Sequence, residues 1–228
     1  MLMLEHVTAA YSGSRVLFGV DIEAGVGEIT CLVGRNGVGK STTMKAIMGL
    51  VNTPSGDIRL DGRSIFKKPT YARAKAGIGY VPQGREIFPK LTVRENIQLG
   101  MEANKSLKEI PRHIFEIFPI LEEFLERRGG DLSGGQQQQL AIARAIVSKP
   151  RVLILDEPTE GIQPSIIQDI GKVITRLKRD MAILMVEQYL EFVLAVSDKC
   201  YVMEKGRILM DGNIKELDKK KLQSLLAM

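Results

Sequence analysis

The sequence predicts an α/β fold in which helices cover a mainly parallel core sheet. Three short segments are almost continuously apolar: Ile29–Val33, Val152–Leu155 and Ala182–Val186. Segments with apolar residues at helical spacing alternate with them, and Ile166–Leu177 is one of these. Strands that are apolar on both faces are typical of parallel sheets, because helices cover both sides. A chain of 228 residues can bury such a core, either as one large domain or with a subdomain.

The first third of the chain begins this alternation. Ile29–Val33 is expected to be a buried strand that leads into a glycine-rich turn, and Thr42–Leu50 is expected to be the helix that follows. Asp57–Leu60 followed by Asp61-Gly62 predicts a strand and a hairpin turn, since such turns favour residues that tolerate positive φ. Ile78–Gln83 is predicted to be a further short strand with an abrupt end.

The sequence pattern changes between about Thr92 and Arg128, where apolar residues recur at helical spacing. This pattern predicts a helical subdomain inserted into the α/β core. The apolar residues that recur there at helical spacing include Ile114, Phe115, Ile117, Phe118, Leu121, Phe124 and Leu125. The core is expected to resume with Val152–Leu155. Near the end of the chain, Ile214–Leu226 has roughly helical spacing of apolar residues and is predicted to be a helix.

Charge and cysteine usage limit the classes of function. A net charge of +5 favours an ordinary solvated surface over nucleic-acid binding, with attraction to anionic lipid or an acidic partner as the other interpretation. Cys31 and Cys200 stand in apolar, strand-like segments, which favours buried free thiols over a disulfide or a metal site. His6 and His113 are far apart in sequence, which argues against a metal site made of side chains alone.

The sequence also indicates where the chain works. No apolar segment approaches the roughly 18 residues that a membrane span needs. The amino terminus lacks the basic start of a secretory signal. We therefore expect a cytosolic chain, or one held peripherally on the cytosolic face of a membrane.

The strongest single motif is the glycine-rich segment Gly34–Ser41, which fits the pattern G-x-x-x-x-G-K-[ST] between a predicted strand and a predicted helix. Its glycines allow consecutive backbone N–H groups to face phosphates. Lys40 would place a positive charge beside the β- and γ-phosphates of a nucleotide, and the Ser41 hydroxyl would ligate Mg²⁺. The motif therefore predicts a nucleoside triphosphate site.

Two carboxylates and an amide are candidates for the chemistry at this site. Asp156 ends a buried strand, where it can reach the Mg²⁺ held by Ser41, and Glu157 can polarise the attacking water as a general base. An ordinary acidic strand end is the alternative for both carboxylates. Gln83 also follows a strand and can contact Mg²⁺ or water; taken alone, it is better explained as an ordinary loop residue.

A second anion-binding feature is the segment Leu132–Gln136, which we call the signature segment. Ser133 is a good helix N-cap, and Gly134 and Gly135 leave backbone N–H groups uncovered at the start of a strongly helical stretch. Such an end favours negative charge.

In order along the chain, the glycine-rich segment, Gln83, the signature segment and Val152–Glu157 resemble the ATPase subunits of ABC (ATP-binding cassette) transporters. The resemblance extends from about Leu4 to Met210. It implies an α/β phosphate-loop NTPase that comprises one domain over 1–228. It also implies an N-terminal antiparallel β subdomain, a RecA-like core at about 1–85 and 150–228, and a helical subdomain at about 86–149.

The resemblance further implies that two cassettes pair head to tail with ATP between them. Each site would take its phosphate loop and carboxylates from one chain and the signature segment from the other. Tyr11 matches the aromatic residue that stacks on adenine, with a strand-edge residue as the alternative. Gln83–Leu99 resembles the surface that meets a membrane permease subunit. Two permeases and an external solute-binding protein would complete an importer at the cytoplasmic face of a bacterial inner membrane.

Together, motif and resemblance assign the site residues and the cofactors ATP and Mg²⁺. The expected nucleotide-binding residues are Tyr11, Gly34, Arg35, Asn36, Gly37, Val38, Gly39, Lys40, Ser41, Thr42, Gln83, Ser133, Gly134, Gly135 and Gln136. The expected Mg²⁺ ligands are Ser41, Gln83 and Asp156. The expected catalytic residues are Glu157, Gln188 and Lys40.

The chain departs from the family pattern at two positions. Gln188 stands where most members have a histidine that contacts the γ-phosphate, and Gln163 stands where an interface aspartate is usual. Both changes put the full hydrolytic strength of this chain's own site in doubt, and a weakly hydrolytic partner cassette is one alternative. This chain is expected to pair with a different ATPase chain, with a homodimer as the alternative.

Other segments indicate a branch of the family. Val186–Gln188 and Tyr80–Pro89 are similar to one ATPase of branched-chain amino acid importers, whereas Thr159–Ile167 and Gln136–Gln139 look closer to urea and short-amide importers. The sequence interpretation therefore favours urea or short-chain amides as the transported solute, with branched-chain amino acids as the alternative.

Overall fold

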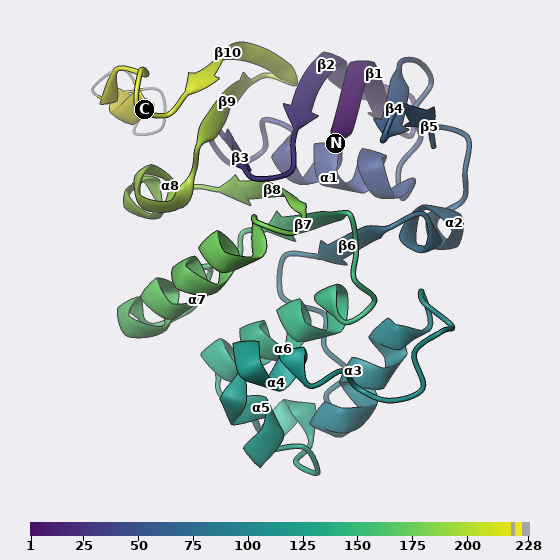
Figure 1. Ribbon diagram of the computed structural model, residues 1–228. Helices are drawn as coiled ribbons and strands as arrows, with labels where there is room; N and C mark the ends of the chain where they lie inside the picture. Colours follow the sequence, from purple (N-terminus) through teal and green to yellow (C-terminus); the bar gives the residue numbers. More distant parts are fainter. Residues whose placement is uncertain (220–221, 225–228) are drawn as a thin grey trace.

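The computed structural model describes residues 1–219 and 222–224, and its core is a six-stranded sheet (Figure 1). In spatial order its strands are β10 (Arg207–Asn213), β9 (Lys199–Glu204), β3 (Ile29–Val33), β8 (Ala182–Glu187), β7 (Val152–Asp156) and β6 (Ile78–Val81). Neighbouring strands run parallel except at the β9–β10 edge. The predicted mainly parallel core sheet is therefore confirmed.

Helices cover both faces of this sheet. The named helices of the described residues are, in chain order, α1 (Lys40–Met48), α2 (Thr70–Lys75), α3 (Val93–Met101), α4 (His113–Ile117), α5 (Pro119–Glu123), α6 (Gly134–Ile146), α7 (Pro164–Leu177) and α8 (Leu190–Val196), with a 3₁₀ turn at Gly129–Asp131. Along β3, alternate side chains enter different apolar clusters: Cys31 faces the cluster that contains α6 and α7 residues, and Leu32 faces the cluster that contains α1 residues. Burial on both faces is the reason that the central strands are apolar throughout.

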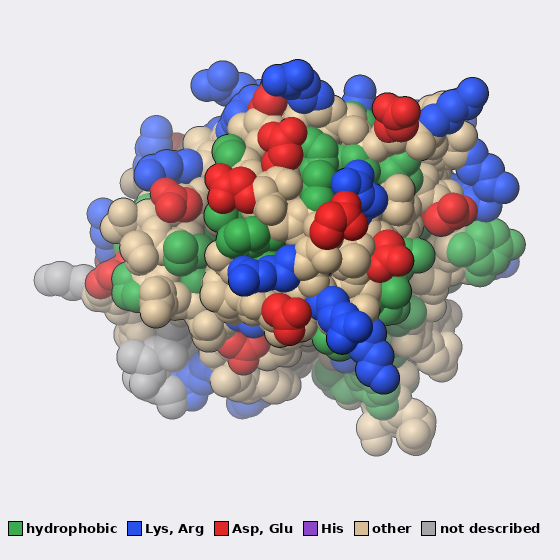
Figure 2. Space-filling view, turned by 90° about the horizontal axis from the view of Figure 1, so that it is seen from below, with side chains coloured by type: hydrophobic (Ala, Val, Ile, Leu, Met, Phe, Trp, Pro, Cys, Tyr) green, Lys and Arg blue, Asp and Glu red, His purple; other side chains and the backbone are tan. Residues whose placement is uncertain are grey.

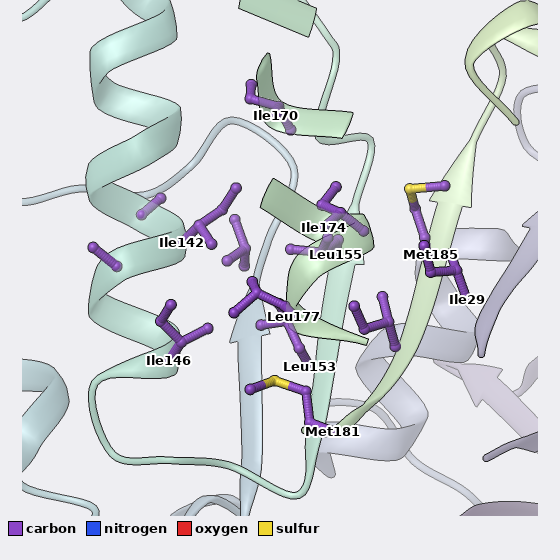
Figure 3. Packing of buried hydrophobic residues seen from close by; sticks show 14 of the residues in the cluster. Ile29, Ile142, Ile146, Leu153, Leu155, Ile170, Ile174, Leu177, Met181 and Met185 are labelled. Carbon is purple, nitrogen blue, oxygen red and sulfur yellow. The ribbon is translucent and has the colours of Figure 1, made fainter. Parts of the chain in front are cut away.

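The apolar cluster that contains α6 and α7 residues packs against the middle of the sheet (Figure 3). Ile142 and Ile146 of α6 and Ile174 of α7 pack with Leu153 and Leu155 of β7, and all five side chains are almost fully buried. Full burial of such a side chain stabilises a fold by about 1.5–3 kcal/mol. The loops at the carboxyl end of β7 and its neighbours therefore start from a rigid support.

A second, antiparallel sheet lies beside α1 and has the order β2 (Ser14–Ala24), β1 (Leu2–Tyr11), β4 (Asp57–Leu60), β5 (Arg63–Ser64). Both of its hairpins turn over two residues with positive φ, Ser12 and Gly13 in one and Asp61 and Gly62 in the other. Positive φ at both positions defines the hairpin turn whose twist matches the strands. The predicted Asp61-Gly62 hairpin and N-terminal antiparallel sheet are confirmed.

The inserted helical segment lies beyond the β6 edge of the core sheet (Figure 1). Here α3 packs so closely against α6 that a Cβ on Gly100 would lie 2.0 Å from the Arg144 carbonyl oxygen. The segment is less continuously helical than the sequence predicted. Residues 102–112 contain no helix, and Pro119 separates the two short helices α4 and α5 because proline disfavours helical geometry at the residue before it.

The outer face of this segment shows acidic and basic side chains interspersed with smaller apolar areas (Figure 2). The subdomain limits of about 86–149 remain a prediction. Among the described residues, none of the helices combines the length and apolarity that crossing a bilayer requires.

The predicted C-terminal helix over Ile214–Leu226 is wrong in its first part. Residues 214–217 form a turn, in which the Asn213 side chain accepts a hydrogen bond from the Lys215 N–H at 3.0 Å. Asparagine side chains offer the backbone this alternative to a helix. Helical geometry occurs at 219 and 222–224, while 220–221 and 225–226 lie outside the described residues. Ile214 and Leu222 are nevertheless buried against the core, as their apolar character favours.

Cys31 and Cys200 are free, buried thiols, which confirms the sequence interpretation. They are direct neighbours across the parallel pair β3–β9. Burial raises the pKa of Cys200 to about 12 and raises the pKa of Cys31 well above its usual value, so both remain protonated at neutral pH.

Candidate nucleotide-binding site

Four adjacent parallel strands, β3, β8, β7 and β6, end at one edge of the core sheet. Ligands of open α/β sheets bind at this carboxyl edge. The loops that leave it enclose a pocket of about 370 Å³. The pocket is lined by Asn36, Gly37, Gly39, Lys40, Ser41, Thr42, Gln83, Glu157, Glu160 and Gln188. The structure thus brings together nine residues that the sequence nominated and one, Glu160, that it did not.

The glycine-rich loop is shaped by backbone constraints. Gly37 and Gly39 have φ values of 78° and 116°, which residues with a Cβ rarely adopt. At Gly39 a Cβ would also lie 2.8 Å from the Leu17 side chain. Gly39 is the N-cap of α1 and provides no side-chain cap, so the first turn of α1 faces the pocket with unpaired N–H groups. This arrangement favours phosphate.

Lys40 is the positive charge of the pocket. Its side chain is almost fully buried, and Nζ donates hydrogen bonds to the carbonyl oxygens of Gly34 at 2.7 Å and Arg35 at 2.8 Å. Burial lowers the pKa of Lys40, and the nearby carboxylates of Glu157 and Asp156 oppose that shift. An ammonium group held by neutral carbonyls is ready to pair with a phosphate.

Asp156 and Ser41 form the predicted Mg²⁺ corner of the pocket. The Ser41 hydroxyl donates to Asp156 Oδ1 at 3.1 Å across the gap between α1 and β7. Burial raises the pKa of Asp156 to about 6, and the neighbouring Glu157 charge adds to the effect. A buried carboxylate, a hydroxyl and the amide oxygen of nearby Gln83 are the hard oxygen ligands that Mg²⁺ prefers. The donor set therefore fits Mg²⁺.

Glu157 stands at the centre of the polar contacts. Its carboxylate accepts hydrogen bonds on both oxygens, from Gln83 Nε2 at 3.2 Å and from Gln188 Nε2. Its backbone has a φ of 51°, a left-handed conformation that is strained for a residue with a Cβ, and its N–H donates to the Val186 carbonyl at 3.0 Å. The two amides therefore hold the carboxylate over the phosphate loop.

The sequence reasoning missed Glu160 and Arg85. Gln83 Nε2 also donates to Glu160 Oε2 at 3.2 Å. Arg85 donates to the Glu160 carbonyl at 2.8 Å and to Gln138 Oε1 of α6 at 3.3 Å, and so connects the loop after β7 with α6. Glu160 could have been found from its place in the loop after Asp156-Glu157. No local pattern identifies Arg85, because its partners are distant in sequence.

Glu187 was also missed as a functional candidate. It is the last residue of β8 and is almost fully buried, and its carboxylate contacts the loop after β7. An acidic residue at the end of the apolar run Ala182–Val186 was the available indication that this carboxylate is buried and hydrogen-bonded.

The signature segment lies outside the pocket. Ser133 is the exposed N-cap of α6, and it forms a reciprocal capping box with Gln136: the Ser133 hydroxyl accepts from the Gln136 N–H at 3.4 Å, and Gln136 Oε1 accepts from the Ser133 N–H at 3.0 Å. Gly134 lies near Gly161 and Arg85, beyond the loop after β7. The structure therefore confirms the helix start and does not place this segment at the chain's own phosphate loop.

Other nominated residues are also absent from the pocket lining: Gly34 and Arg35, whose carbonyl oxygens accept from Lys40 Nζ, and Tyr11 and Val38. The interface position Gln163 lies outside it as well. Tyr11 ends β1 and is 44% exposed. Gln163 is the exposed N-cap of α7 and makes no side-chain capping bond. Val38 packs against the cluster beside α1 rather than into the pocket. A larger groove of about 790 Å³ between α7 and α8 contains none of the nominated nucleotide residues.

The fold and the pocket define a phosphate-loop ATPase. The model of the family described as "ABC transporter" matches residues 17–160, and the chain belongs to that family. It binds ATP with Mg²⁺ and hydrolyses the nucleotide.

Curated relatives match nearly the whole chain. It is 40% identical to the high-affinity branched-chain amino acid transport ATP-binding protein BraG of Pseudomonas aeruginosa, over 92% of this chain and 91% of that protein. It is 38% identical to the probable branched-chain amino acid transport ATP-binding protein LivF of Archaeoglobus fulgidus, over 95% and 94%. It is also 33% identical to the lipopolysaccharide export system ATP-binding protein LptB of Escherichia coli, over 95% and 92%.

A solved structure supports the same assignment. The ADP conformation of an ATP-binding cassette from an ABC transporter superposes with a TM-score of 0.82 at 27% identity, over 100% of this chain and 94% of the other. That cassette therefore has the same fold as this chain.

Proposed function

We propose that this chain is the energy-coupling ATPase of an importer for branched-chain amino acids. The similarity to BraG and LivF over more than nine-tenths of the chain supports this solute class. Urea and short amides, which the sequence interpretation favoured, have less support because the reported relatives are not described as urea transporters. The segments shared with branched-chain amino acid ATPases, Val186–Gln188 and Tyr80–Pro89, agree with this choice.

The observation that carries the catalytic part of the proposal is the placement of Glu157 over the phosphate loop by two amides. In this proposal Glu157 orients and deprotonates the attacking water, while Lys40 and the first turn of α1 stabilise charge on the phosphates. Ser41, Asp156 and Gln83 hold Mg²⁺, which neutralises phosphate charge when bound. Gln188 provides a neutral donor where a histidine is usual, and so keeps Glu157 in position.

The second half of the proposal is a dimer with a shared site. The α6 end is exposed and the signature segment is turned away from the chain's own pocket, so a partner's nucleotide is its natural ligand. A heterodimer with a second cassette suits the asymmetry that Gln188 and Gln163 introduce. Tyr11 would stack on the adenine, which fits its exposed position at a strand end.

The remaining partners belong to the membrane. We propose that Gln83–Leu99 meets a permease subunit, because this stretch begins at the pocket with Gln83 and leads into α3 on the helical face. Exposed Phe88 is an apolar contact point within it. Two permeases and an external solute-binding protein would complete the importer, with this chain on the cytoplasmic face of the inner membrane.

The catalytic proposal is tested with purified chain by steady-state Mg²⁺-ATPase assay. Glu157→Gln keeps the shape of the side chain and removes its basicity, so we expect kcat to fall by at least about 100-fold. Nucleotide binding measured by fluorescence titration should be retained, since the phosphate loop is intact. Turnover close to the wild-type rate in Glu157→Gln would show that another group is the base.

The solute proposal is tested in proteoliposomes that contain this chain with its paired cassette, its permeases and the solute-binding protein. We expect ATP-dependent uptake of radiolabelled leucine and no uptake of labelled urea. The Glu157→Gln variant is the control for leakage. Uptake of urea without leucine would reinstate the short-amide interpretation and would leave the ATPase assignment intact.

A further inference from the structure

One buried carboxylate links the two loops that carry the proposed catalytic residues. Glu187 ends β8 and is 2% exposed. Its Oε1 accepts hydrogen bonds from the backbone N–H of Thr159 at 2.9 Å and from the Thr159 hydroxyl at 2.7 Å. Its Oε2 accepts from the N–H of Gln188 at 2.9 Å and from the N–H of Tyr189 at 3.3 Å. Each oxygen therefore serves a different loop.

One of the two linked loops, the loop after β7, begins with a strained residue. Thr159 lies two positions beyond Glu157, whose φ of 51° is strained for a residue with a Cβ. Such a conformation persists only when the surrounding contacts impose it. Gln188, which donates to the Glu157 carboxylate, follows Glu187 directly. A single side chain therefore fixes the backbone on both sides of the Glu157–Gln188 contact.

We propose that Glu187 is a positioning residue for ATP hydrolysis, which sets the distance between the loop after β7 and the loop after β8. Glu187 is not among the residues that line the pocket, so it acts through Glu157 and Gln188 rather than on the nucleotide. The inference rests on the proposed role of Glu157 as general base and adds a residue that serves that role.

The chemistry of the contacts requires a carboxylate. All four groups around Glu187 donate hydrogen bonds, and an ionised carboxylate accepts on both oxygens. A glutamine accepts on one atom only and turns its NH₂ toward two further donors. Glu187→Gln therefore keeps the size of the side chain and releases one of the two loops.

The test is steady-state ATPase kinetics together with Mg²⁺-ATP binding on the purified full chain. For Glu187→Gln we expect kcat to fall by about tenfold or more, because small displacements of a catalytic group carry large rate penalties. The dissociation constant for Mg²⁺-ATP should stay within about twofold of wild type, since uniform binding is untouched. A positioning role thus predicts loss in kcat without loss of affinity.

Asp198→Asn is the control for loss of a carboxylate that accepts a backbone N–H at a strand end, although Asp198 is more exposed than Glu187 and also pairs with Lys178 Nζ at 2.8 Å. Asp198 Oδ2 also accepts a backbone N–H at a strand end, from Ile29 at 2.8 Å, but at the start of β3 and away from the pocket. We expect this variant to retain kcat. If Asp198→Asn and Glu187→Gln lose kcat equally, the effect comes from general destabilisation and the proposal is overturned.

A second pair of variants decides the matter if Glu187→Gln does not fold. Thr159→Val removes the hydroxyl that donates to Glu187 Oε1, and Thr159→Ser retains it. We expect Thr159→Val to lower kcat and Thr159→Ser to restore it. If Thr159→Val has the wild-type kcat and Glu157→Gln is inactive, the positioning role of Glu187 is overturned. Activity in Glu157→Gln itself would instead overturn the proposed catalytic base.

Discussion

Two helix N-termini of this molecule, those of α1 and α6, are built in opposite ways. The α1 end has glycine as its N-cap, is entered from a buried strand, and carries Lys40 as an almost fully buried charge. The α6 end is capped by the Ser133 hydroxyl, and that residue is exposed. Both ends present backbone N–H groups that favour anions.

The difference indicates that the α1 end encloses its ligand, whereas the α6 end presents an exposed surface to its ligand. Lys40 and Glu157 line the pocket at the α1 end, and Asp156 accepts a hydrogen bond from Ser41 of that lining. The capping box of the α6 end pairs the N–H groups of Ser133 and Gln136, and this end stands outside that pocket. A change at the α1 end should already affect the isolated chain, whereas a change at the α6 end should affect only the dimer.

Replacing Lys40 is the largest test of this contrast. In Lys40→Ala, phosphate charge at the α1 end goes uncompensated, and losing a charged hydrogen bond of up to about 3 kcal/mol weakens ATP binding by roughly 100-fold. Isothermal titration of the monomeric chain measures the effect. Because Lys40 belongs to the enclosed end, ATP affinity equal to wild type would contradict the assignment of the pocket.

Ser133→Arg tests the other end. A bulky cation there should reduce turnover of the dimer by about tenfold or more, because it removes one side of the partner's phosphate site. ATP binding to the isolated chain should remain within about twofold, since the pocket is separate. In the ATPase assay without permeases, Thr92→Arg is the matched control, because Thr92 caps α3 with the same kind of capping box. Loss of ATP binding by the isolated Ser133→Arg chain would refute the division of roles.

Burial raises the pKa of Asp156 to about 6. The enclosed end, at α1, should therefore also respond to pH. Mg²⁺ requires the ionised carboxylate, so its half-saturating concentration in the ATPase assay should rise by about tenfold per pH unit below pH 6. Because the pKa of Asp156 is higher in the folded state, this group stabilises the folded apo-protein at a pH below the usual aspartate pKa. That stabilisation is lost as the pH rises through about 6. Asp156→Asn should abolish this contribution to the pH dependence of apo-protein stability in chemical denaturation. An unchanged stability profile in that variant would place the titrating group elsewhere.

Gln188→His should have the smallest effect and sharpens the comparison within the pocket. A neutral histidine can donate to Glu157 as Gln188 does, and it can also approach a phosphate. We expect kcat at or above the wild-type value, with Gln188→Ala below it. Complete inactivity of Gln188→His would show that the amide geometry has a specific role.

Most of the fold was predictable because its central strands are buried on both faces. The strands that contain Ile29–Val33, Val152–Leu155 and Ala182–Val186 follow from apolar runs alone, and α7 follows from its helical spacing. The errors lie where local hydrogen bonds compete with periodicity. Asn213 and Pro119 end or prevent helices that the apolar pattern alone extends through.

The candidate site divides in the same way. Lys40, Ser41 and Asp156 were found because a short motif and a strand end carry their chemistry in the local sequence. Arg85, Glu160 and Glu187 were not, because each acts on groups from another loop. Their partners become neighbours only after the parallel strands align.

The sequence by itself determined the α/β class and the glycine-rich phosphate-loop motif, and it predicted the residues around the nucleotide, since glycine spacing and apolar runs act within a few residues. Only the tertiary structure decided which loops meet. It placed Gln83 and Gln188 on opposite oxygens of Glu157, kept the signature segment out of that pocket, and set Glu187 beneath two loops. The physical reason is that parallel pairing brings strand ends that are far apart in sequence to one edge of the sheet.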